Sequence, residues 1–141
     1  MGDEASDLTF LQPPGWAPAK GYANGIAARG RLVFVAGQIG WNPATGAFES
    51  DDFVAQVTQT LQNVAAVLKE AGAEPHHLTR LTWYITDKPA YLAGLREIGQ
   101  AYREIFGRHY PAMAVVVVSA LIEDRAKVEI EVTAVVPAPL P

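Results

Sequence analysis

The segment from Ala112 to Val118 reads AMAVVVV and carries neither a charge nor a hydroxyl group. Successive side chains of a strand point to opposite faces of a sheet, so a strand with one face in water alternates apolar and polar residues. Because this segment does not alternate, it predicts a strand that is covered on both faces.

The remaining pattern predicts an α+β fold. Apolar residues three and four apart predict a helix within 50–72, capped by Ser50 or Asp51 and ended by Gly72, and a second helix between Asp87 and Gly107. Strands are expected at 25–30, 31–38, 78–86 and 127–136, the first two as a hairpin around Gly30. The order β-β-α-β-α-β-β predicts one mixed sheet with two helices on one face.

Two helices leave the other face of such a sheet uncovered. Leu32, Phe34 and Ala36 point to one side of their strand and Val33 and Val35 to the other, and both sides are apolar. We expect Val33, Val35 and alternate residues of the 114–118 run to need cover on the far face. A second subunit would supply it, since an exposed apolar sheet of this extent is unusual on a monomer. The alternative is that the N-terminal segment folds over that face.

Length and composition narrow the functional classes. The 141 residues favour one domain over 21–136, preceded by an irregular lead-in at 1–20 and followed by a proline-rich tail at 137–141. The net charge of −4, from 11 basic and 15 acidic residues, argues against nucleic acid or an anionic membrane as partner. There are no cysteines and no glycine-rich phosphate loop. We therefore expect a cytoplasmic protein with no cofactor and no bound metal.

Several segments, in this order and spacing, closely resemble the reactive intermediate deaminase (Rid) family, also called YjgF or L-PSP. The resemblance spans about residues 20–136 and rests on AGQI with NPATG, on YPA before an apolar strand, and on KVEIE. It implies a chorismate-mutase-like fold that assembles as a homotrimer with a central β-barrel and small-molecule sites in the clefts between subunits. It also implies hydrolysis of imines or enamines to ketoacids and ammonia.

The resemblance assigns site residues one by one. Family members grip the substrate carboxylate with an Arg after the Pro-Ala dipeptide, and a Glu of the last strand activates or positions water. The Glu falls on Glu129, and the Arg position is occupied by Met113. A family Asn of the second helix falls, by a looser alignment, on Gly99. The implied pocket residues are Tyr22, Gly37, Gln38, Met113 and Val115, to which Trp41 is added because it follows the GQIG segment.

Met113 argues against the usual substrates, because a thioether offers no donor for a carboxylate. Three functions stay open: hydrolysis of a C=N bond in a substrate without that carboxylate, binding of a small metabolite without turnover, and recruitment of a protein to the trimer surface. Arg29, Arg31 or Arg125 would have to reach the cleft to replace the lost cation, but each fits a solvated turn or loop residue better, as most charged side chains do.

Simpler roles exist for the same residues. Glu129 also fits an ordinary exposed sheet face, Tyr22 plain packing, and Trp41 a turn residue at the end of the barrel. Trp83 is expected in the core. The adjacent His76 and His77 would point to opposite faces of a strand and make a poor chelate.

Overall fold

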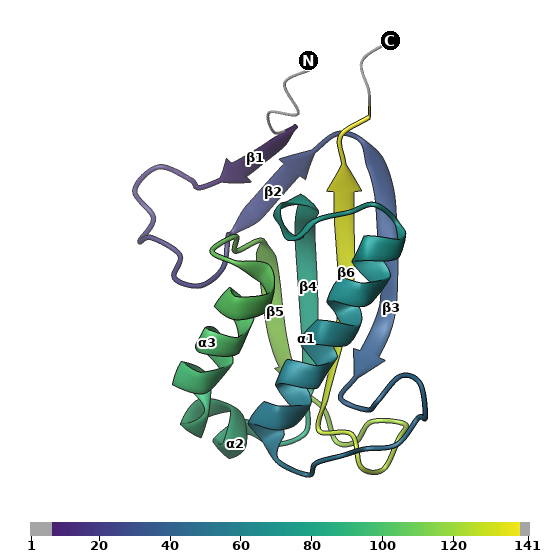
Figure 1. The fold of residues 1–141 in the computed structure, drawn as a ribbon. Helices are drawn as coiled ribbons and strands as arrows, with labels where there is room; N and C mark the ends of the chain where they lie inside the picture. The colour runs from purple at the N-terminus through teal and green to yellow at the C-terminus, as the bar shows by residue number, and fades with distance from the viewer. Residues whose placement is uncertain (1–6, 139–141) are drawn as a thin grey trace.

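A computed structural model describes residues 7–138, so the predicted tail at 137–141 lies partly outside the described residues (Figure 1). The fold is α+β, as predicted, with one mixed four-stranded sheet and two main helices. The sheet has the order β3-β6-β4-β5, in which β4 and β5 are parallel and the other pairs are antiparallel. Its strands are β3 (Arg31–Ile39), β4 (Leu78–Ile85), β5 (Ala112–Val117) and β6 (Val128–Val136).

Helix α1 (Phe53–Glu70) forms where the apolar stripe was recognised. Its buried apolar residues, together with polar Gln56, Thr60 and Asn63, face the sheet. The cap is Asp52 rather than Ser50 or Asp51, because its Oδ2 accepts a hydrogen bond from the backbone N–H of Ala55 at 2.9 Å. Gly72 follows the end of the helix with a φ of 70°, as expected for the residue that stops it.

The second predicted helix is divided into α2 (Lys88–Ala93) and α3 (Leu95–Phe106). Asp87 caps α2 as expected, through a 2.9 Å hydrogen bond from the N–H of Ala90 to its Oδ1. The break falls at Gly94, where a Cβ atom would lie 2.9 Å from Cγ2 of Val54 on α1. The close approach of the two helices at this point therefore requires a glycine, which in turn interrupts the helix.

The expected hairpin around Gly30 is wrong. Strand β2 (Gly25–Ala28) pairs instead with β1 (Leu8–Leu11), a strand inside the lead-in that was expected to be irregular, and the two form a separate antiparallel pair. Gly30 has a φ of 147°, and a Cβ there would lie 2.2 Å from the carbonyl oxygen of Val136. Gly30 is needed because the chain passes against β6 as it leaves one sheet for the other.

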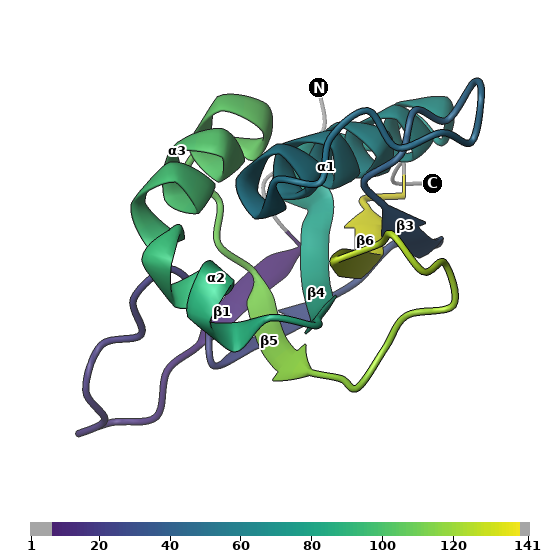
Figure 2. The same cartoon turned by 90° about the horizontal axis from the view of Figure 1, so that it is seen from below.

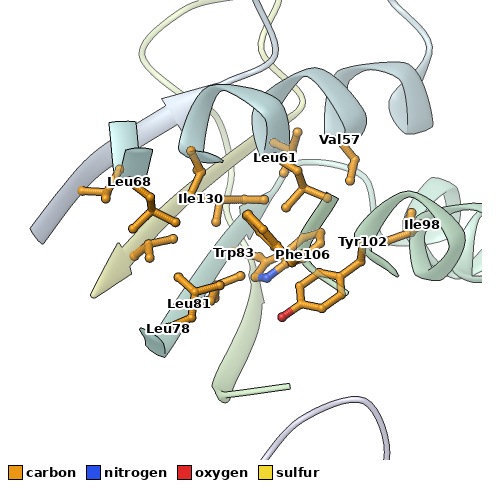
Figure 3. Close-up of a cluster of buried hydrophobic side chains, with 14 of the residues drawn as sticks. Val57, Leu61, Leu68, Leu78, Leu81, Trp83, Ile98, Tyr102, Phe106 and Ile130 are labelled. Atoms are coloured by element: carbon orange, nitrogen blue, oxygen red, sulfur yellow. The ribbon is translucent and has the colours of Figure 1, made fainter. Parts of the chain in front are cut away.

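The helices lie on one side of the four-stranded sheet (Figure 2). The core lies between the helices and the sheet and includes Leu61 of α1, Trp83 of β4 and Phe106 of α3 (Figure 3). A short 3₁₀ turn, Pro75–His77, connects α1 to β4. No helix within residues 7–138 is long and apolar enough to cross a membrane.

The face of the sheet opposite the helices is open, but the apolar residues on it are not the ones that the sequence predicted. Val35 is buried in the core and Val33 packs against it, so both lie on the helix side, and the prediction that they need cover on the far face is wrong. Their neighbours Leu32 and Phe34 occupy the far face and are 58% and 73% exposed. The alternation was recognised correctly, but the sequence does not say which set faces the helices. The described N-terminal residues leave this face uncovered.

Candidate functional site

Met113 and Val115 lie on β5 beside Leu81 and Trp83 of β4, with which they pair in register. Because Leu81 and Trp83 are buried under the helices, Met113 and Val115 also point to the helix side. Both line a cavity of about 240 Å³ between β5 and α3. Gly99, the position of the family Asn, lines the same cavity.

Tyr22 lies near this cavity but does not line it. The N–H of Ala23 donates to the carbonyl of Pro111 at 2.9 Å, which places Tyr22 beside the start of β5. Its side chain, 43% exposed, borders a separate hollow formed mainly by residues 10–24. Tyr110 lines both the cavity and this hollow.

Glu129 and Gly37 form a second cluster. A Cβ atom on Gly37 would lie 2.7 Å from Cδ of Glu129, so the carboxyl group rests against the bare backbone of β3. A register shift between Val35 and Gln38 breaks the β3–β6 pairing at this point. The Gln38 amide turns back to donate to the carbonyl of Ala36 at 3.0 Å. The Glu129 carboxylate, half-buried, makes no ion pair with the described residues.

Next to Glu129 on the far face, the hydroxyl of Tyr84 donates to Oε1 of Glu131 at 2.6 Å. This hydrogen bond, aided by the negative charges of Glu131 and Glu129, raises the pKa of Tyr84 above its ordinary value of 10. Glu131 thus has a hydrogen-bond partner within its own chain, whereas the Glu129 carboxylate has no ion-pair partner among the described residues.

The two clusters do not meet in one chain. Glu129 alternates with the buried Val128 and Ile130 and so faces away from the helices, while Met113 and Val115 face toward them. In addition, β6 and β5 are separated by β4. A site that combines both clusters therefore needs residues from two copies of the chain.

The other residues considered from the sequence lie elsewhere. Trp41 packs against Phe48, with 6.0 Å between ring centroids, and its carbonyl accepts a hydrogen bond from Asn63. Arg31 donates to the carbonyl of Ala71 at the end of α1, and Arg125 pairs with Asp51 at 2.9 Å. These two arginines, and the exposed Arg29, do not line the cavity that contains Met113.

Sequence reasoning missed two features of that cavity. Arg103 of α3 lines it, with its Nη1 only 3.1 Å from where a Cβ of Gly99 would be. Trp83, expected only as a core residue, also forms part of its wall. The spacing of Gly99 and Arg103, four residues apart on a helix, is the signal that could have placed the arginine over the glycine.

Comparison with known proteins identifies the family. The family model described as Endoribonuclease L-PSP matches residues 14–136. The chain belongs to this family. An Aquifex aeolicus RutC family protein is 36% identical over 125 residues, which cover 87% of this chain and 94% of that protein.

Two further proteins are similar to this L-PSP family member. The crystal structure of YyfB from Yersinia pestis, described as a conserved Rid family protein of unknown function, aligns with a TM-score of 0.81 at 30% identity. The alignment covers 92% of this chain and 99% of YyfB. Human 2-iminobutanoate/2-iminopropanoate deaminase is 28% identical over 105 residues, covering 74% of this chain and 73% of the human protein.

Proposed function

We propose that this protein is a homotrimer that hydrolyses the C=N bond of a small imine, or of the imine tautomer of an enamine, in clefts between its subunits. Its substrates would lie outside the 2-imino acids for which the human relative is named. The observation that carries the proposal is the position of Glu129, a carboxylate without an ion-pair partner among the described residues that lies against the bare backbone of Gly37.

The need for several subunits is supported by two features of the single chain. Phe34 and Leu32 expose apolar side chains on a sheet face that the helices leave open. The Glu129 cluster and the Met113 cluster lie on opposite faces of that sheet. Packing copies of the chain through the open face buries the first feature and brings residues of different chains together around one cleft.

Glu129 suits the chemistry because imine hydrolysis needs one group that handles a proton. As the oxygen of water attacks the imine carbon, the Glu129 carboxylate accepts a proton from that water and the C=N bond becomes a C–N single bond. The proton then passes to the nitrogen. Collapse of the resulting carbinolamine forms the carbonyl product and expels ammonia, so no oxidant, reductant or metal is consumed.

Met113 sets the limit on the substrate. A carboxylate next to the C=N carbon would face a thioether where the family resemblance implies a guanidinium, and its desolvation would be uncompensated at that position. The family description names an endoribonuclease, but the excess of acidic residues, 15 against 11 basic, disfavours an RNA substrate here.

The test is hydrolysis of an imine that has no carboxylate, formed in situ by a flavin amine oxidase from benzylamine. The native protein should accelerate aldehyde release, and Glu129→Gln should reduce the acceleration by about 100-fold or more. Glu131→Gln, which changes an acid on the same face of the same strand, is the matched control and should retain activity. Equal activity of native and Glu129→Gln protein would refute the catalytic assignment.

The second candidate is a trimer that binds a small metabolite without turning it over. It is favoured by the apolar walls of the cavity at Met113, because no described Asp or Glu residue lines this cavity. Ligand binding with no acceleration of any imine hydrolysis would support this candidate.

A further inference from the structure

The cavity between β5 and α3 has the size and the walls of a site for one ring. Most of its wall is apolar or aromatic, and the deepest side chains include Trp83, Ile98 and Tyr102. An apolar protein cavity of about 150 Å³ is large enough to hold benzene. At about 240 Å³, this cavity has room for a six-membered ring with a substituent of a few atoms.

The charge at this cavity is positive. Lys20 and Arg103 are the charged side chains among its described lining residues, and no acid lines it. The ion pairs of the described residues engage Arg125 and His76, so neither Lys20 nor Arg103 is paired with a carboxylate there. Arg103 is exposed and lies across Gly99, where even a methyl group would press on its guanidinium. A glycine at 99 thus lets the cation rest at the mouth of the cavity.

Trp83, one of the lining residues, also carries a buried polar atom. Trp83 is 3% exposed, and its indole Nε1 is buried without a hydrogen-bond partner among the described residues. An indole N–H can only donate, and leaving it unpaired when buried costs free energy. Because this nitrogen is fully buried, a molecule in the cavity would contact the ring of the indole rather than its N–H.

We propose that this cavity binds a small aromatic carboxylate. The ring lies between the β5 residues Met113 and Val115 and helix α3, against the indole ring of Trp83, and the carboxylate pairs with Arg103 at the mouth. The inference rests on the proposed function, because it names the imines that the cleft would accept: those with an aryl group and a carboxylate remote from the C=N bond. A 2-imino acid with a methyl side chain would leave most of the cavity empty.

The test is binding of phenylacetate to the intact native protein. Binding is monitored through the indole N–H signals in ¹H–¹⁵N spectra. The variants Trp16→Phe and Trp41→Phe each remove one indole signal, and the signal that remains in both belongs to Trp83. This assignment leaves the buried Trp83 unchanged. We expect phenylacetate to shift the Trp83 signal. Arg103→Gln should weaken binding about tenfold, since a charge-assisted pair is lost. Arg96→Gln, on the same helix but outside the cavity, is the matched control and should leave the affinity unchanged.

Two comparison ligands sharpen the result. 2-Phenylethylammonium, which has the ring but the opposite charge, and acetate, which has the charge but no ring, should both bind at least about tenfold more weakly than phenylacetate. An unshifted Trp83 signal at high phenylacetate concentration, or equal affinities of native and Arg103→Gln protein, would overturn the inference. Binding requires no turnover, so phenylacetate binding in a protein that hydrolyses no imine would refute the proposed hydrolysis and leave the pocket assignment standing.

Discussion

The carboxyl group of Glu129 fills the space that a side chain at Gly37 would occupy. Cδ, Oε2 and Cγ of Glu129 lie 2.7, 2.9 and 3.0 Å from the position of a Cβ atom on Gly37. Contacts below 3.0 Å do not occur between real Cβ atoms and their neighbours, so glycine at 37 and the conformation of Glu129 are coupled. The β3 backbone at this point is thus part of the surface that holds the carboxylate.

Gly37→Ala should displace the Glu129 carboxylate and reduce imine hydrolysis by about tenfold or more, because small misplacements of a reacting group are costly. The measurement is the rate of aldehyde release from the benzylamine-derived imine. In the Glu129→Gln background, the same change should add little further loss, since the group that it displaces is already inactive. Additive losses in the double variant would contradict the coupling of these two residues.

Assembly should depend on the open sheet face. Phe34→Glu places a charge at a side chain that is 73% exposed in the single chain and that we expect to be buried between subunits. Sedimentation should show a trimer for the native protein and a shift toward monomer for Phe34→Glu. Ile122→Glu adds the same charge at a loop residue that is 97% exposed and should remain trimeric. A stable native monomer would remove the basis for a site between subunits.

Periodicity predicted most of the fold because the local pattern and the tertiary packing agree. The stripe that includes Val57, Leu61 and Leu68 defines α1, and the alternation of Val128 and Ile130 with Glu129 defines β6. Pairing partners were harder to predict. Gly30 carries the same signal for a hairpin turn as for a close backbone approach, and only the three-dimensional contact with Val136 distinguishes the two.

The candidate site shows the same division. The resemblance located Met113 and Val115, and in the structure they line one cavity together with Gly99. Neither Arg103 nor Trp83 could be assigned to that cavity from the sequence. The spacing from Gly99 places the arginine over a glycine, but an arginine on an exposed helical face is indistinguishable from any solvated charge until the cavity beside it is seen.

Alkaline pH should destabilise the protein through Tyr102. Burial, aided by the neighbouring Tyr110, raises the pKa of Tyr102 well above its ordinary value of 10, and its hydroxyl donates to the carbonyl of His109 at 2.6 Å. The folded chain therefore holds this proton more tightly than the unfolded chain does. The resulting stabilisation is complete below pH 10 and is lost as the pH rises above it.

Tyr102→Phe should cost about 1 kcal/mol at pH 8, from the lost hydrogen bond, and should reduce the loss of stability between pH 8 and pH 11. Urea unfolding at the two pH values measures both effects. Tyr22→Phe, at an exposed tyrosine, is the control and should follow the native protein. An alkaline loss of the same size in Tyr102→Phe and native protein would assign it to other groups.

Met113→Arg should give the protein activity toward 2-imino acids. The native protein should show little acceleration with 2-iminopropionate formed in situ from serine, because a thioether cannot pair with the carboxylate. A guanidinium at 113 supplies two charge-assisted hydrogen bonds, which corresponds to a gain of about tenfold or more. Met113 is half-buried in the cavity wall, so the longer side chain can extend into the cavity volume rather than into the core.

Met113→Leu keeps the apolar wall and is the control, which should stay as inactive toward 2-iminopropionate as the native protein. Robust turnover of 2-iminopropionate by native protein would show that another cation already serves its carboxylate, and Arg103 would be the first to change because it lines the same cavity. Loss of that turnover in Arg103→Gln, with Arg96→Gln unaffected, would place the carboxylate at α3 rather than at β5. The Met113→Arg and Arg103→Gln variants together therefore decide which element of the cavity selects the substrate.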